Sequence, residues 1–140
     1  MAISHESVQE LFSNLATGQG ERFFERVSDD VDWTVMGTHP LAGRYRSKAE
    51  FMDHTFARLG RIFEKGVKLV AEHVYIDGET AIVELKAIAT DLRGKSFDNR
   101  YCWVCRFSGE TIVEVRAYLD SAMVASFVEA NEALLGVAPH

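Results

Sequence analysis

The chain has 140 residues, of which 47% are hydrophobic and 26% are charged, and its formal net charge is -6. This length suits one hydrophobic core, so we expect a single domain over residues 1–140. Clustered Lys and Arg, a membrane-spanning apolar run and a signal peptide are all missing, so we expect a cytoplasmic protein with no nucleic-acid or membrane partner.

The first half of the chain mixes helix and strand patterns. Apolar residues at helical spacing predict helices over Glu6–Asn14 and Glu21–Val27. Alternating side chains predict a strand over Val31–Met36. The glycines and proline of residues 37–47 (GTHPLAGRYRS) predict a loop, and Ser47, with a glutamate three residues later, is a capping-box signal for a third helix.

The second half of the chain predicts a sheet followed by a helix. Four strand patterns are separated by glycine-containing turns: Val67–Ile76, Thr80–Leu92, Ser96–Phe107 and Thr111–Leu119. They predict an antiparallel meander, and a last helix starts at Asp120 or Ser121. This order predicts an α+β fold with helices on one face of an antiparallel sheet, and a pocket where the wrapping is incomplete.

Cysteines and histidines give no sign of a metal or redox site. Cys102 and Cys105 lie three residues apart in a strand pattern, so their side chains point to opposite faces and form neither a disulfide nor a redox turn. We expect no metal site, because zinc-ligand spacing does not occur among His5, His54, His73 and His140. A GxGxxG motif and a P-loop are also missing, so we expect no cofactor.

Five short segments carry a family resemblance through their order and spacing: Asp30–Trp33, Pro40–Tyr45, Arg93–Lys95, Phe107–Gly109 and Arg116–Asp120. Together they resemble the landmarks of the NTF2-like superfamily, and most closely its SnoaL-like branch, which includes polyketide cyclases and is related to ketosteroid isomerases. The resemblance covers nearly the whole chain. It implies a cone-shaped, curved antiparallel sheet wrapped around three to four helices, which encloses one apolar pocket, usually in a dimer.

The resemblance also implies catalytic positions, and several are altered here. In the cyclase and epoxide hydrolase branches a catalytic aspartate follows the arginine of the last strand, and that position is Ala117, which cannot exchange a proton. The tyrosine and asparagine of the epoxide hydrolase branch fall on Trp33 and Val35. Its arginine and aspartate fall on Glu84 and Lys86, in swapped order. The resemblance therefore argues against epoxide hydrolysis and against the inherited aldol mechanism.

Strict alternation along the strands predicts which side chains line the pocket. The expected ligand-binding residues are Trp33, Val35, Leu59, Phe63, Ile88, Asn99, Tyr101, Trp103, Ala117, Leu119 and Val124. This lining is mostly apolar and aromatic, as is usual for a small-molecule site. The opposite face carries Arg100, Arg106, Glu114, Arg116 and Tyr118, which suit a solvated face or a dimer interface.

Three residues are candidates for catalysis. The same alternation places Glu84 and Lys86 inward, where Glu84 would act as general base beside a carbonyl and Lys86 would hold the enolate oxygen. His39, in the loop at the expected pocket mouth, would act as acid or base near neutral pH. The alternatives are that Glu84 and Lys86 face solvent or form a structural ion pair, and that His39 is a solvated loop residue.

These observations predict a small-molecule pocket protein of the SnoaL-like kind. Its expected activity is cofactor-independent isomerisation or cyclisation of a hydrophobic or polyketide-like metabolite, in a homodimer formed through the outer sheet face. One alternative is a non-catalytic ligand-binding or accessory protein with the same fold. Another is a purely structural dimer in which large side chains fill the cavity.

Overall fold

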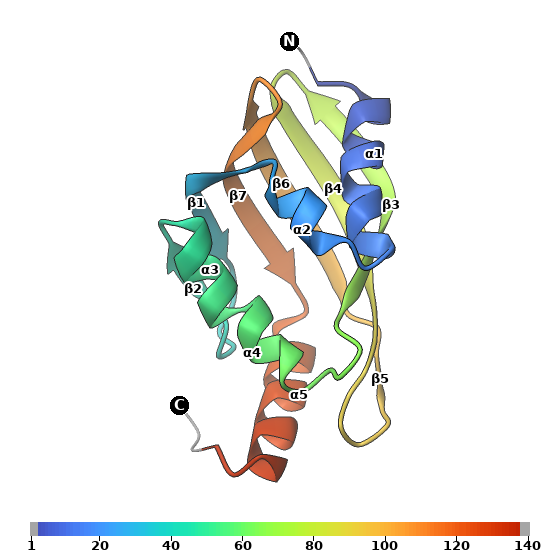
Figure 1. The fold of residues 1–140 in the computed structure, drawn as a ribbon, viewed down its shortest axis with the longest axis vertical. Coiled ribbons are helices and arrows are strands. Elements are labelled where there is room, and N and C mark those ends of the chain that lie inside the picture. Colours follow the sequence, from blue (N-terminus) through green and yellow to red (C-terminus); the bar gives the residue numbers. More distant parts are fainter. Residues whose placement is uncertain (1–2, 138–140) are drawn as a thin grey trace.

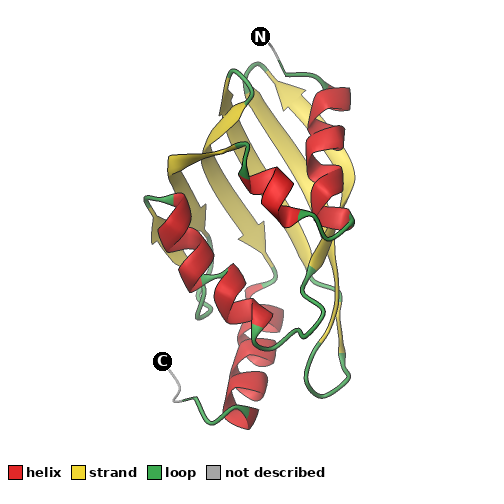
Figure 2. Ribbon diagram, viewed as in Figure 1, coloured by secondary structure: helices red, strands yellow, loops and turns green. Residues whose placement is uncertain are grey.

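The computed structural model describes residues 3–137 and shows most helices on one face of a curved sheet, with the C-terminal helix at the end of the sheet (Figures 1 and 2). The helices are α1 (His5–Ala16), α2 (Gly20–Phe24), α3 (Lys48–His54), α4 (Phe56–Gly60) and α5 (Ser121–Leu134). The strands are β1 (Val27–Val35), β2 (Gly43–Tyr45), β3 (Lys68–Asp77), β4 (Thr80–Thr90), β5 (Ser96–Phe97), β6 (Arg100–Ser108) and β7 (Thr111–Leu119). The predicted α+β class is confirmed.

The sheet has the strand order β2-β1-β7-β6-β4-β3, with β5 paired to β4. Strands β3, β4, β6 and β7 pair antiparallel, so the predicted meander is confirmed. Strand β1 instead lies parallel to β7, which makes the sheet mixed, whereas we expected it to be antiparallel throughout. Parallel neighbours need a long connection, which the chain between β1 and β7 provides by forming α3, α4 and most of the meander.

Side-chain caps fix where three helices begin. The Ser4 hydroxyl accepts the Ser7 N–H at 3.1 Å at the start of α1. The Ser47 hydroxyl accepts the Glu50 N–H at 3.0 Å at the start of α3. Asp120 Oδ1 accepts the Met123 N–H at 3.1 Å at the start of α5. Each bond satisfies a backbone donor that a helix leaves free in its first turn, and the predicted roles of Ser47 and Asp120 are confirmed.

The predicted third helix is divided into α3 and α4 at Thr55. The Thr55 hydroxyl donates to the Phe51 carbonyl at 2.7 Å, and the Thr55 backbone departs from helical geometry, with φ of -119° and ψ of -76°. A side-chain bond of this kind to the preceding turn can bend a helix, and here the Thr55 amide also keeps its bond to the Phe51 carbonyl at 3.0 Å. The sequence also did not predict β2, which lies inside the expected loop and pairs Tyr45 with Trp33.

Aromatic side chains fill the space between the helices and the sheet. The Trp33 ring stacks on Phe51, with ring centroids 3.9 Å apart, and meets Trp103 edge to face at 5.2 Å. Nearer to α5, a second buried cluster consists of Phe63, Phe97 and Phe127. The stacked Trp33–Phe51 pair joins β1 to α3, so it fixes one wall of the molecule's inner face.

The turn after β1 passes very close to the start of α5. Gly37 has a φ of +116°, a conformation that residues with a Cβ rarely adopt. A methyl group at this position would overlap the Ser121 hydroxyl and approach His39 Cδ2 to 2.9 Å. Only glycine therefore lets the loop that carries His39 lie against the N-terminus of α5.

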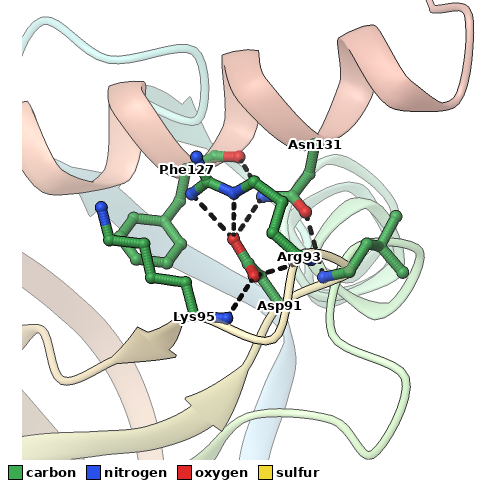
Figure 3. A network of polar contacts seen from close by, with 6 residues as sticks. Asp91, Arg93, Lys95, Phe127 and Asn131 are labelled. Carbon is green, nitrogen blue, oxygen red and sulfur yellow. Dashed lines mark hydrogen bonds and ion pairs between the residues drawn. The ribbon is translucent and has the colours of Figure 1, made fainter.

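A polar network joins the β4–β5 turn to α5 (Figure 3). The buried Asp91 carboxylate accepts hydrogen bonds from the backbone amides of Arg93 and Lys95, both at 2.9 Å, and from Asn131 Nδ2 at 3.0 Å. It also pairs with the Arg93 guanidinium at 2.8 Å. Burial alone would raise the pKa of Asp91, but these hydrogen bonds outweigh it and lower the pKa to about 2.

Candidate functional site

An apolar pocket lies on the inner face of the sheet, between β1, β6 and β7 and the helices α3, α4 and α5. Its lining consists of Trp33, Val35, His39, Leu41, Phe51, Thr55, Phe56, Leu59, Val67, Leu69, Tyr101, Trp103, Ala117, Leu119 and Val124. The cavity volume is about 50 Å³, which is small beside the roughly 300–1,000 Å³ typical of ligand pockets. A ligand of ordinary size would therefore have to displace side chains.

The pocket floor comes from neighbouring strands in register. Val35 lies opposite Ala117 on β7, and Ala117 lies opposite Trp103 on β6. Tyr101 and Leu119 form the next inward pair. Ala117 has the smallest side chain in this row and is only 2% exposed. Ala117 is also the position at which the resemblance implies a catalytic aspartate.

The helices supply the opposite wall. Phe51 and Thr55 come from α3 and its C-terminal end, while Phe56 and Leu59 come from α4. Helix α4 is one short segment with no side-chain cap and no fully buried residue. Phe56 and Leu59 are only partly buried, so this part of the wall is less firmly anchored than the buried core.

His39 lies in the pocket wall with both ring nitrogens engaged. The Leu41 amide donates to Nδ1 at 3.1 Å, and Nε2 lies 3.0 Å from the Met36 carbonyl. An amide can only donate and a carbonyl can only accept, so Nδ1 is unprotonated and Nε2 carries the proton. Burial lowers the pKa of His39, despite the opposing effect of the Met36 bond. The side chain is therefore neutral and buried, not the solvated loop residue of our alternative reading.

Glu84 and Lys86 do not face the pocket. Along β4 the buried residues are Ala81, Val83, Leu85 and Ala87, and Glu84 is exposed on the opposite face. Val83 pairs with inward Trp103, whereas Glu84 pairs with Cys102 on the outer face. The predicted inward orientation of Glu84 and Lys86 is therefore wrong, because β4 buries the odd-numbered residues and turns the even-numbered ones outward.

Three further residues predicted to line the pocket lie elsewhere. Ile88 lies on the same face of β4 as Glu84, the outer face, and is 54% exposed. Phe63 is fully buried in the Phe63–Phe97–Phe127 cluster, away from the pocket lining. Asn99 is fully buried just before β6 but is also outside the lining. The other eight predicted residues lie at the pocket, and whether they bind a ligand stays a prediction.

Sequence reasoning missed several wall residues. Phe51, Thr55 and Phe56 were not predicted, although they share near-helical spacing with the predicted Leu59, which would have indicated a single inward helical face. Leu41 and Val67 come from loops, and no sequence pattern places loop residues against a sheet. Leu69 is the inward residue at the start of β3, and the alternation of that strand was the available signal.

The outer face of the sheet is charged. Ion pairs join Arg44 to Asp32 at 2.7 Å, Arg100 to Glu72 at 2.6 Å and Arg106 to Glu114 at 2.9 Å. The Arg44 hydrogen bond lowers the pKa of Asp32. These exposed pairs are cross-strand contacts of small energetic value.

Neither a metal cluster nor a membrane helix is found in the part of the chain that the structure describes. Within residues 3–137, no three His, Cys, Asp or Glu side chains are grouped so that they could hold a metal ion. His140 lies outside the described residues. Over the same range, every helix is too short or too polar to cross a membrane. Both cysteines are free, with Cys105 buried and Cys102 partly exposed.

Residues 8–115 match the family model of the SnoaL-like domain. The chain belongs to the SnoaL-like family. Its solved structural neighbours include an NTF2-like protein from Burkholderia thailandensis, which is 27% identical, has a TM-score of 0.74, and aligns over 87% of this chain and 94% of the other. The predicted NTF2-like fold of this SnoaL-like chain is thereby confirmed.

Two curated relatives of this SnoaL-like chain are named as cyclases. The dimerizing cyclase phiC, from a fungal species, is 31% identical over 134 residues, which are 93% of this chain and 59% of the relative. The dimerizing cyclase tstC of Talaromyces stipitatus is 26% identical over 116 residues, which are 80% of this chain and 52% of the relative. The SnoaL-like chain thus spans little more than half the length of the curated relatives it matches.

Proposed function

We propose that this chain binds a hydrophobic small molecule in the inner-face pocket and promotes its cyclisation or isomerisation. The observation that carries the proposal is the apolar, aromatic-walled pocket in a SnoaL-like chain. The names of the two curated relatives support a cyclase over a passive binding protein. An intramolecular aldol-type closure forms one carbon–carbon bond and moves one proton from carbon to oxygen, so it needs no redox cofactor.

The pocket would act mainly by holding the reacting ends together. Binding a flexible chain in a folded shape removes much of the entropy cost of ring closure. Among the described lining residues none is a carboxylate, and only His39 and Tyr101 carry a titratable proton. Because both nitrogens of His39 are engaged, we assign it to the wall and do not retain it as a free acid or base.

Access would depend on helix α4. The cavity as it stands holds only a few atoms, so a substrate must move Phe56 and Leu59 away from Trp33 and Trp103. Short, weakly anchored segments open at low cost compared with the core. The two tryptophans are the only ones in the chain and both line the pocket, so their fluorescence reports on occupancy directly.

The test is a cyclisation assay with matched variants. A linear polyketone thioester would be incubated with the wild-type chain, and its ring-closed isomer or dehydrated product measured by liquid chromatography and mass spectrometry. Ala117→Leu, which places a larger side chain in the floor of the cavity, should abolish acceleration over buffer. Glu84→Gln, on the outer face, should retain the full rate. Equal rates for wild type and Ala117→Leu would contradict the proposal, and ligand binding without turnover would favour the accessory-protein alternative.

We further propose that the outer sheet face joins two copies of the chain. Tyr75, Ile88 and Tyr118 are large hydrophobic residues left exposed, and the strand pairing places them on this face. Such exposure together with charged cross-strand pairs suits a self-complementary interface. Sedimentation should give a dimer for the wild type and a monomer for Tyr118→Glu, and a monomeric wild type would contradict the dimer.

A further inference from the structure

Two buried hydrogen-bond donors in or beside the pocket have no partner. Trp33 is 1% exposed and lines the pocket, and its indole Nε1 makes no hydrogen bond. Asn99 is fully buried, and its Nδ2 also makes none. An unsatisfied buried donor costs about 1–3 kcal/mol. Because most buried polar groups are paired, each exception needs an explanation.

Asn99 has a specific neighbour in the pocket. Asn99 lies immediately before β6, two residues from Tyr101, which lines the pocket. The Asn99 amide oxygen is occupied by the Arg100 N–H at 2.9 Å, which directs its Nδ2 group away from that amide. The Asn99 side chain lies close enough to the Tyr101 hydroxyl to lower its pKa, although the contact falls short of strict hydrogen-bond geometry.

Tyr101 is therefore placed as a neutral donor. Burial raises the pKa of Tyr101 to about 12, against the smaller lowering by Asn99, so the phenol keeps its proton near neutral pH. A phenol can accept one hydrogen bond while donating its own. Tyr101 lines the pocket, and a hydrogen bond from Asn99 Nδ2 to the Tyr101 oxygen would leave the Tyr101 proton to a group inside the pocket.

We propose that the ligand carries an acceptor oxygen, a carbonyl or its enolate, and that this oxygen takes a hydrogen bond from Tyr101, which Asn99 orients. The inference rests on the proposed ligand-binding function and specifies its chemistry. Trp33 Nε1 is a second donor of the same kind in the same wall. The lining has two titratable side chains, His39 and Tyr101, and neither offers the ligand an anionic group. The pocket therefore favours a ligand oxygen that accepts a hydrogen bond over one that donates a hydrogen bond. Tyr101 would contact the ligand, and Asn99 would be a positioning residue.

The test compares two probes of nearly the same shape, 1-tetralone, which has a carbonyl, and tetralin, which lacks it. Binding to the wild-type chain would be measured by quenching of Trp fluorescence, corrected for absorption by the probes. We expect 1-tetralone to bind roughly tenfold more tightly than tetralin, the effect of one well-formed hydrogen bond. Equal affinities in the wild type would overturn the inference while leaving the pocket intact as a binding site. Failure of both probes to bind would overturn the proposed function as well.

Variants then assign the preference to particular residues. Tyr101→Phe keeps the ring and removes the hydroxyl, so the affinity ratio of the two probes should fall to about one. Tyr118→Phe removes a phenol hydroxyl from the outer face and should leave the ratio unchanged. Asn99→Asp keeps the acceptor for Arg100 and removes the donor, so the ratio should fall at least threefold.

The affinity ratio of the two probes distinguishes a positioning role of Asn99 from a purely structural role. A purely structural loss in Asn99→Asp would weaken both probes equally and leave their ratio as in the wild type, which would overturn the role of Asn99. Thermal unfolding monitored by circular dichroism would show whether each variant is folded. An unchanged ratio in folded Tyr101→Phe would overturn the whole inference.

Discussion

Asp91 offers a quantitative test of the polar network that holds the β4–β5 turn on α5 (Figure 3). The change is Asp91→Asn, which keeps the size of the side chain and removes its charge. In the wild type, the carboxylate accepts bonds from two backbone amides, from Asn131 and from the Arg93 guanidinium. An amide in its place cannot accept all of them, so Arg93 loses its charged partner.

The magnitude follows from the pKa of Asp91. An ordinary aspartate has a pKa of about 3.9, and each tenfold change in acid dissociation corresponds to about 1.4 kcal/mol. Lowering the pKa to about 2 therefore adds about 2–3 kcal/mol to the free energy of unfolding near neutral pH. Because the folded-state pKa is depressed, this contribution is present above about pH 4 and is lost as the pH falls from there through 2.

The assay is urea unfolding of wild type and Asp91→Asn between pH 7 and pH 3. A loss of about 2–3 kcal/mol, with a urea slope of about 1–3 kcal/mol per M, should lower the variant's urea midpoint at pH 7 by roughly 1 M. The gap between the two proteins should shrink below pH 4. Asp98→Asn, which alters an exposed carboxylate nearby, should change the free energy of unfolding by less than about 0.5 kcal/mol. A gap of the same size at pH 3 and pH 7 would refute the reasoning.

Three further predictions concern the loop, the thiols and the pocket mouth. Gly37→Ala should lower the free energy of unfolding, measured in urea, by about 1–3 kcal/mol, because the added methyl group overlaps Ser121 and the backbone φ is strained for alanine. If the variant unfolds at the same urea concentration as the wild type, the close approach to Ser121 is contradicted. Maleimide should label one thiol of the folded chain, Cys102, and should label Cys105 only after unfolding, because Cys105 is fully buried and burial raises its pKa. Equal labelling rates for the two thiols in the folded chain would contradict this prediction. Phe56→Ala should tighten binding of the larger ketone anthrone relative to 1-tetralone, measured by Trp fluorescence, and an unchanged ratio would mean that Phe56 does not limit entry.

The sequence predicted elements best where local chemistry determines them. The last strand was predicted as Thr111–Leu119, and β7 has these bounds because a glycine turn starts it and the Asp120 cap ends it. The split at Thr55 was not predictable from spacing, because apolar residues at helical spacing continue across it. The parallel pairing of β1 with β7 depends on tertiary contacts that no local pattern encodes.

The site was only partly predictable, and the reasons are physical. On β7 the apolar series through Val115 and Ala117 alternates with Glu114 and Arg116, so the inward position of Ala117 could be inferred. On β6 the series through Trp103 was the more aromatic one. On β4 both faces carry apolar residues, so Ile82 and Ile88 made the wrong face look internal. Every second residue through Val83 and Leu85 is apolar, whereas the alternate set includes Glu84 and Lys86. The wholly apolar set was therefore the better indicator of the buried face.

Register irregularities also limited the prediction. Arg106 pairs with Glu114, but Phe107 pairs with Ile112, so β7 has one extra residue at Val113. This bulge buries Ile112, although strict alternation from Ala117 would have placed Val113 inward. The part of β7 beyond the bulge keeps the expected parity, so the positions near Ala117 were unaffected.

The most direct test of the central claim is an NMR titration of the two indole N–H groups. The chain has two tryptophans, and both line the pocket, so two indole signals are expected from the ¹⁵N-labelled protein. If the inner-face pocket is the ligand site, adding 1-tetralone should shift both signals saturably in the wild type and in Glu84→Gln, and neither in folded Ala117→Leu. If 1-tetralone binds by calorimetry while both indole signals stay unmoved, the ligand site lies elsewhere and the account is contradicted.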